Sequence, residues 1–162
     1  MLHILAAGGL ISFLNFGIHA LMTALVVVVT RHTASQTGHL HAFVRLVALL
    51  AVTMLALMIA HVLELAVWGA FYGLIGFPIQ ETGTARFSGG YFEFAFENYT
   101  ALGYGDPVPP PNLRLFGPMT ALNGLLLIGW SVFVIFEVMR MAEIRFQRAE
   151  PLSDNSDVKE PE

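Results

Sequence analysis

Three long apolar segments alternate with shorter polar stretches along the chain. They run from Ile4 to Thr30, from His41 to Phe77 and from about Leu113 to Met141. The first contains no Lys, Arg, Asp or Glu, and it lacks the basic start of a cleaved signal peptide. Each segment is long enough to cross the roughly 30 Å hydrocarbon core of a bilayer as an α-helix. The pattern therefore predicts three membrane-spanning helices.

Polar side chains inside the first two segments follow helical spacing. Asn15 and His19 lie four residues apart, and His61 and Glu64 lie three apart, so each pair shares one helical face. For Asn15 and His19 we expect hydrogen bonds between helices rather than a ligand role. A glutamate inside a membrane helix is costly and indicates a functional site by default. His61 and Glu64 either hydrogen-bond to each other or bond to the third helix, and the alternative is that they form a proton-sensing pair.

The second segment and the connection before it leave further alternatives open. The segment is longer than one crossing requires, so its helix tilts, extends past the bilayer or breaks near Gly69 or Gly73. The connection contains His32, His39 and His41. No helical spacing joins these histidines, so we expect a solvated turn rather than a metal site.

Composition places the chain among small membrane proteins. Of its 162 residues, 56% are hydrophobic and only 12% are charged, about half the charged share that is usual in soluble domains. The absence of cysteine excludes disulfides and thiolate metal sites. The eight basic residues form no patch, so nothing points to nucleic acid as a partner.

A stretch of irregular sequence, Thr100–Asp106, lies between the second and third spans at membrane depth. Irregular backbone is tolerated there only when it is buried in protein or lines a water-filled path. Gly103 and Gly105 alternate with Leu102 and Tyr104. Glycines can take left-handed dihedrals at alternate positions, which turns successive carbonyl groups to the same side. Such a stack of oxygens can replace the hydration shell of a dehydrated cation.

The sequence around this stretch resembles the pore loop of potassium channels. Residues Phe94–Asp106 read FAFENYTALGYGD, and the usual filter of that family reads Thr-Val-Gly-Tyr-Gly-Asp. The resemblance extends from Phe43 to Ile144 but is specific only in the filter region. It implies an all-α membrane protein with three transmembrane helices, a re-entrant pore helix, a selectivity filter and a tetrameric pore, since an axial ring needs four loops.

The resemblance also implies a function and its ligand. It predicts passive, potassium-selective conduction by a homotetramer in a lipid bilayer, with K⁺ as the permeant ion, no cofactor and no enzymatic activity. The filter residues that it assigns are Ala101, Leu102, Gly103, Tyr104 and Gly105, with K⁺ held at the carbonyl oxygens of the first four.

Three residues are expected to support the filter: Glu97, Thr100 and Asp106. The resemblance places Glu97 near the end of a pore helix that begins at about Ser88 and reaches Tyr99. In several family members the glutamate at this place shares a proton with the filter aspartate, here Asp106, and so clamps the filter from behind. An exposed Glu97 is the alternative.

One departure from the family pattern concerns the innermost ion site. The usual filter threonine is replaced by Ala101, so the hydroxyl oxygens of that site are missing. Thr100, one residue earlier, faces the protein in the family geometry and cannot replace it. A weakly selective or non-selective cation channel is therefore an alternative function. A non-conducting scaffold or sensor with a vestigial pore loop is a second alternative. A third, a membrane enzyme built on His61 and Glu64, is disfavoured because neither a nucleophile nor a full set of metal ligands accompanies these residues.

The inner helix and the titratable pairs are candidates for gating. Gly124 matches the place of a hinge glycine in many relatives, and Gly129 adds a second flexible point, although close packing explains a membrane glycine equally well. Opening could depend on pH through His61 with Glu64, or through the two carboxylates beside the filter. At the inner end of this helix, Glu137 and Arg140 are spaced to form a pair.

The distribution of charged residues predicts how the chain is oriented in the membrane and how it divides into regions. Arginines flank the first loop and follow the last span, so the positive-inside rule predicts an N-terminus outside and a C-terminus in the cytoplasm of the cell membrane. We expect an extra N-terminal helix and loop over residues 1–42, a pore domain over 43–144, and a disordered acidic tail over 145–162.

Overall fold

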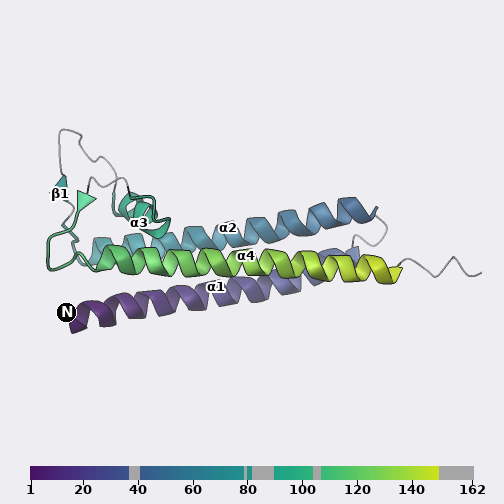
Figure 1. Cartoon of the computed structure of the whole chain (residues 1–162), viewed down its shortest axis with the longest axis horizontal. Helices are drawn as coiled ribbons and strands as arrows, with labels where there is room; N and C mark the ends of the chain where they lie inside the picture. Colours follow the sequence, from purple (N-terminus) through teal and green to yellow (C-terminus); the bar gives the residue numbers. More distant parts are fainter. Residues whose placement is uncertain (37–40, 79, 82–89, 104–106, 150–162) are drawn as a thin grey trace, which may run out of the picture.

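The computed structural model consists of three long helices that lie along one axis and a short helix packed near one end (Figure 1). The long helices are α1 (Leu2–Gln36), α2 (Ala42–Leu74) and α4 (Phe116–Ala149), and the short one is α3 (Tyr91–Tyr99). Each pair of long helices is in contact, and α3 packs against α2 and α4. The residues that the structure describes are 1–36, 41–78, 80–81, 90–103 and 107–149.

The long helices confirm the three predicted spans. Segments Leu2–His32, Phe43–Leu74 and Phe116–Ile144 are long enough to cross a membrane, and an 18-residue stretch within each has a mean hydropathy of 2.0, 2.6 and 2.0, respectively. Many of their large apolar side chains are exposed on the single chain. In water such a surface would be a liability, whereas lipid tails solvate it without cost.

Helix α2 is continuous, so of the three alternatives for this segment the break near Gly69 or Gly73 is wrong. Its 33 residues span about 50 Å at 1.5 Å per residue, which exceeds the hydrocarbon core. Gly69 instead lies against α3, where an added β-carbon would approach the Phe92 Cα to 3.1 Å. The glycine thus permits the short helix to pack closely against the long one.

A left-handed turn ends α2. Gly76 has φ +58° and donates its N–H to the Gly73 carbonyl, while the Phe77 N–H donates to the Tyr72 carbonyl at 2.9 Å. These two bonds form a Schellman motif, in which glycine takes the left-handed position without a steric penalty. Phe77 then packs on Tyr72, with ring centroids 4.8 Å apart, so the turn directs the chain back toward the core.

Two short strands, β1 (Gln80–Glu81) and β2 (Pro107–Val108), pair in antiparallel register, with Gln80 opposite Val108 and Glu81 opposite Pro107. The sequence did not predict them. β1 precedes α3 and β2 follows the filter segment, so the pairing brings together the two ends of the region between α2 and α4.

Buried apolar side chains form two clusters along the bundle. The larger is rich in aromatic residues and lies between α3 and the neighbouring parts of the long helices; its fully buried members include Trp68, Tyr72, Phe77 and Tyr99. The smaller is aliphatic and involves α1, α2 and α4 farther along, with Val26 and Leu57 among its members. Aromatic packing is therefore concentrated around the short helix.

The N-terminus and the end of α4 lie at opposite ends of the bundle, as a topology with the two termini on opposite sides of a membrane requires. The N-terminus is at the α3 end of the bundle, and the C-terminal end of α4 is at the opposite end (Figure 1). Helix α4 begins at Phe116, later than the predicted Leu113, because residues 111–115 form turns. It continues to Ala149 and so includes the first five residues of the segment that we expected to be a disordered tail; residues 150–162 lie outside the described part of the chain.

Candidate pore loop and buried histidine–glutamate cluster

Helix α3 directs the chain toward the predicted filter. It begins after Gly90, and its buried side chains are Phe94, Ala95, Glu97 and Tyr99. Phe94 packs edge-on against Tyr72 of α2, with ring centroids 5.1 Å apart. The aromatic face therefore anchors α3 against the spans.

Helix α3 ends in a second Schellman motif, this time with alanine at the left-handed position. The Ala101 N–H donates to the Asn98 carbonyl at 2.9 Å, and the Leu102 N–H donates to the Glu97 carbonyl at 3.0 Å. Ala101 has φ +55°, a conformation that costs a residue with a β-carbon about 1–2 kcal/mol. The abrupt turn at Ala101 fixes the direction in which the chain leaves the helix.

The backbone after this turn follows part of the predicted pattern, in which left-handed residues occur at alternate positions. Gly103 has φ +57°, so left-handed residues occur at positions 101 and 103, with Leu102 between them. The left-handed conformation expected of Gly103 is therefore present. Tyr104, Gly105 and Asp106 lie outside the described residues, and the predicted stack of carbonyl oxygens and the role of Asp106 stay predictions.

The two remaining support residues of the predicted filter have distinct environments. The Thr100 hydroxyl donates to the Phe96 carbonyl at 2.9 Å, so it is turned back onto its own helix. The Glu97 side chain is buried, which rules out the exposed alternative for this residue. Its predicted sharing of a proton with Asp106 falls outside the described residues.

Gly124 and Gly129, the two candidate gating glycines of α4, differ in their surroundings. A β-carbon at Gly124 would lie 2.0 Å from the Tyr99 carbonyl oxygen, so α4 contacts the end of α3 backbone to backbone. At Gly129, no atom of the described residues lies within 4 Å of such a β-carbon. Gly124 is a close-packing site, and hinge motion at either glycine stays a prediction.

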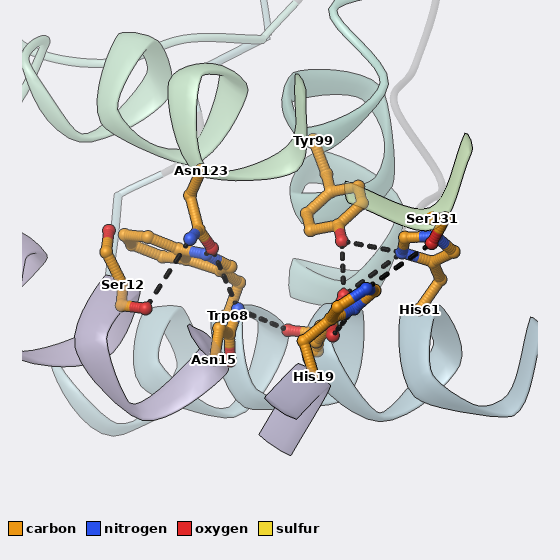
Figure 2. Close-up of polar contacts among 9 residues, drawn as sticks. Ser12, Asn15, His19, His61, Trp68, Tyr99, Asn123 and Ser131 are labelled. Carbon is orange, nitrogen blue, oxygen red and sulfur yellow. Dashed lines mark hydrogen bonds and ion pairs between the residues drawn. The ribbon is translucent and has the colours of Figure 1, made fainter. Parts of the chain in front are cut away.

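A second candidate site is a buried polar cluster centred on Glu64 (Figure 2). The His19 Nδ1 lies 2.8 Å from one carboxylate oxygen, and the His61 Nδ1 lies 3.0 Å from the other. The Tyr99 hydroxyl donates to the same oxygen that contacts His61. His19 and Glu64 are fully buried, whereas the His61 side chain is 18% exposed.

Ser131 of α4 joins both imidazoles on their other side. Its Oγ lies 2.9 Å from the His61 Nε2 and 3.4 Å from the His19 Nε2. The cluster therefore contains side chains from all four helices (Figure 2). The predicted pairing of His61 with Glu64, and the bond from this pair to the third span, are both confirmed.

A network of amides lies beside this cluster (Figure 2). The Asn15 Nδ2 donates to the Asn123 Oδ1 at 2.9 Å and to the Glu64 carbonyl at 3.3 Å. The Trp68 Nε1 donates to the same Asn123 oxygen at 2.9 Å. The bonds between helices predicted for Asn15 and His19 are confirmed, and α1 is tied to α2 and α4 through buried polar groups.

The sequence pairs His61 with Glu64 but gives no sign that His19 and Tyr99 complete the cluster. The partners are separated by 45 and 35 residues, and helical spacing identifies a shared face without identifying the neighbouring helix. Among the described residues, His19, His61 and Glu64 form a group that could hold a metal ion, because their ligand atoms all lie within 4.8 Å of one another.

At the opposite end of α4, Arg140 donates two hydrogen bonds to Glu137, at 2.6 and 2.9 Å. The predicted pair is confirmed. The Arg140 side chain is exposed and that of Glu137 is half-buried on the single chain, and a salt bridge in such a place contributes little to stability. The pair therefore stabilises the local helix surface rather than a buried site.

Comparison with known proteins gives one match. A family model described as "Ion channel" matches residues 60–141, which include the C-terminal part of α2 from residue 60, the whole of α3 and most of α4. The match covers half of the chain and leaves α1 outside it. No curated protein and no solved structure matches the chain.

Proposed function

Because the chain belongs to the ion channel family, we propose that four copies assemble around an axis and conduct K⁺ passively across a membrane. In this proposal the ions pass the carbonyl oxygens of Ala101, Leu102, Gly103 and Tyr104, and Gly105 completes the filter. Each chain contributes one loop, so the pore requires the homotetramer.

The observation that carries the proposal is the path of the chain between α2 and α4. Strand β1 leads toward α3, and β2, which follows the filter segment, pairs with it in antiparallel register. The segment between them therefore leaves and returns at one place. A short helix within such a loop, ending in the left-handed turn at Ala101, is the arrangement that a re-entrant filter needs.

Exposure of the filter segment supports assembly into a ring. On the single chain, Ala101, Leu102 and Gly103 are all exposed, and the Leu102 side chain is 55% exposed. Backbone of this kind cannot face lipid, because lipid offers its N–H and C=O groups no partners. Three further copies around an axis would cover the Leu102 side chain and leave the carbonyl groups facing a water-filled path.

Selective conduction is tested with purified protein in liposomes. We expect K⁺ flux, and under bi-ionic K⁺ and Na⁺ conditions a reversal potential displaced from zero in the direction of K⁺ selectivity. The variant Tyr104→Ala removes a filter side chain and should lose that selectivity. Native mass spectrometry of the same sample should give the mass of four chains.

The second candidate function is weakly selective cation conduction. It is favoured by the absence of a threonine hydroxyl at Ala101 and by the Thr100 hydroxyl, which bonds to Phe96 within its own helix. A reversal potential near zero under bi-ionic conditions would support it over the selective channel. Liposomes without any flux under varied pH and voltage would instead favour a non-conducting scaffold.

A further inference from the structure

We propose that His19, His61 and Glu64 form a binding site for a divalent transition-metal ion of the Zn²⁺ type, with the Tyr99 hydroxyl as a fourth oxygen ligand. The site is separate from the filter. Metal binding is measured directly on the protein, so the proposal does not rest on ion conduction.

The donor set has the composition of a zinc site. Two imidazole nitrogens and one carboxylate are established zinc ligands, commonly with an oxygen in the fourth position. Zn–N and Zn–O bonds of about 2.0–2.2 Å place neighbouring ligand atoms of a tetrahedral site roughly 3.4 Å apart. The His19 and His61 Nδ1 atoms lie 2.8 and 3.0 Å from the carboxylate oxygens of Glu64. Outward shifts of about half an ångström would therefore bring these two nitrogen–oxygen pairs to the spacing of a metal site.

The Tyr99 hydroxyl is placed to complete the set. It lies 2.9 Å from the His61 Nδ1 and donates to a Glu64 oxygen, so it converges on the same point as the other donors. Tyr99 is fully buried at the end of α3, where its backbone packs against Gly124. Its position is therefore fixed by contacts outside the cluster.

Ser131 provides the outer support that metal-bound histidines need. Such histidines donate their second N–H to an oxygen acceptor, which fixes the tautomer and the orientation of the ring. Both Nε2 atoms face the Ser131 Oγ, and a hydroxyl oxygen can accept two hydrogen bonds. When the two neutral imidazoles instead carry their protons on Nδ1, toward Glu64, the single hydroxyl proton of Ser131 satisfies only one Nε2. A metal ion on the Nδ1 side lets both Nε2 atoms donate to Ser131.

Charge also favours a bound cation. Glu64 is fully buried within a membrane-spanning helix, and its ion pairs are with His19 and His61, which are charged only when protonated. A buried carboxylate without a compensating charge is costly. A metal ion supplies that charge while both imidazoles remain neutral ligands.

Occupation of this site would connect the extra helix to the pore. The ligands come from α1 and α2, the fourth oxygen from α3, and the outer support from α4. Tyr99 lies two residues before Ala101, the first residue of the predicted filter. A bound ion would therefore fix α1 against the body of the channel and hold the end of α3 in place.

The test measures Zn²⁺ binding to the full-length protein in detergent micelles by isothermal titration calorimetry, after removal of metal with a chelator. The background variant carries His32→Gln, His39→Gln and His41→Gln, so that the histidines between the first two spans do not contribute. We expect one ion per chain and a higher Tm with Zn²⁺ than without it. Co²⁺ in place of Zn²⁺ should give the visible absorption of a tetrahedral site.

Single substitutions in this background identify the ligands. His19→Gln and His61→Gln should each weaken Zn²⁺ binding more than tenfold, and Ser131→Ala, which removes only the outer support, about tenfold. His3→Gln changes an exposed histidine on the same helix as His19 and should leave binding unchanged. Gel filtration of each variant as a tetramer verifies that loss of binding is not loss of folding.

Three results would overturn the proposal. The first is the absence of saturable Zn²⁺ binding in the background variant. The second is binding that both His19→Gln and His61→Gln retain. The third is a Tm that changes with pH but not with Zn²⁺, because that result would identify the cluster as a proton-binding site.

Discussion

Gly124 of α4 and Tyr99 of α3 are in backbone contact: a β-carbon at position 124 would lie 2.0 Å from the Tyr99 carbonyl oxygen and 2.8 Å from its carbon. No real β-carbon approaches a backbone carbonyl this closely. The inner helix and the end of the pore helix can therefore adopt this packing only with glycine at position 124, as in other close approaches of membrane helices.

The first prediction is that Gly124→Ala destabilises the channel. The added methyl group must push α4 away from α3, and overpacking of this kind costs about 1–3 kcal/mol or more. We expect a lower Tm in detergent, measured by tryptophan fluorescence or calorimetry, and reduced K⁺ flux in liposomes. Gly129→Ala is the matched control, because the described residues leave space there and alanine favours helix formation.

The same two variants separate packing from hinge motion. A stability loss confined to Gly124→Ala supports close packing. If both variants keep the wild-type Tm and both alter channel opening, the glycines act as hinges and the packing explanation is contradicted.

The second prediction concerns the amide that joins three helices. Asn123→Leu should lower stability by about 1–3 kcal/mol for each buried donor that it leaves unsatisfied, because the Trp68 and Asn15 N–H groups both lose their acceptor. Thermal unfolding in detergent is the measurement. Asn112→Leu changes an exposed asparagine and should leave the Tm near that of the wild type. Equal Tm values for the two variants would contradict the role assigned to Asn123.

The third prediction concerns Ala101, which has φ +55° at the end of α3. Ala101→Gly should raise stability by about 1 kcal/mol, because glycine adopts left-handed dihedrals without the steric cost of a β-carbon. In the proposed channel, Ala101→Thr would restore the hydroxyl of the innermost ion site and should increase the permeability of K⁺ relative to Na⁺. It should also lower stability, since a β-branched residue is strained at positive φ.

For the Ala101 variants, bi-ionic reversal potentials measure selectivity and Tm values measure stability. Ala101→Gly removes only a methyl group and should not increase K⁺ selectivity, which makes it the control for the added hydroxyl. A more selective Ala101→Gly channel would show that backbone strain, and not the missing hydroxyl, limits selectivity.

The fourth prediction is that Thr100→Val leaves ion selectivity unchanged. The Thr100 hydroxyl donates to the Phe96 carbonyl, which turns it back onto its own helix, and we expect it to make no contact with a permeant ion. Reversal potentials of Thr100→Val and the wild type should therefore agree. A large shift toward zero would mean that this hydroxyl reaches the ion path in the assembled channel.

Sequence reasoning predicted the parts of the fold that depend on hydropathy and on a local motif. The three spans follow from long apolar runs, and α3 follows from its place before the glycine-rich segment. A break in α2 near Gly69 was one of three alternatives for the second span, but Gly69 permits contact with Phe92 instead. Sequence alone does not distinguish these uses of glycine, because both depend on what lies opposite the residue.

The buried cluster could be predicted only within one helix. His61 and Glu64 are three residues apart, so their contact follows from helical geometry. His19 and Ser131 lie on other helices, and their contacts depend on how α1 and α4 rotate against α2. The pairing of β1 with β2 was missed for a similar reason: two residues per strand are too few to give an alternating pattern.

The wide separation in sequence between α1 and its polar partners has a consequence for biosynthesis. Asn123 lies 108 positions after its partner Asn15 in the sequence, and Ser131 lies 112 positions after His19. The first helix therefore enters the bilayer before the last has left the ribosome. The bonds of its polar side chains to Asn123 and Ser131 can form only when α4 inserts, which makes insertion of that helix the step that completes the buried polar network.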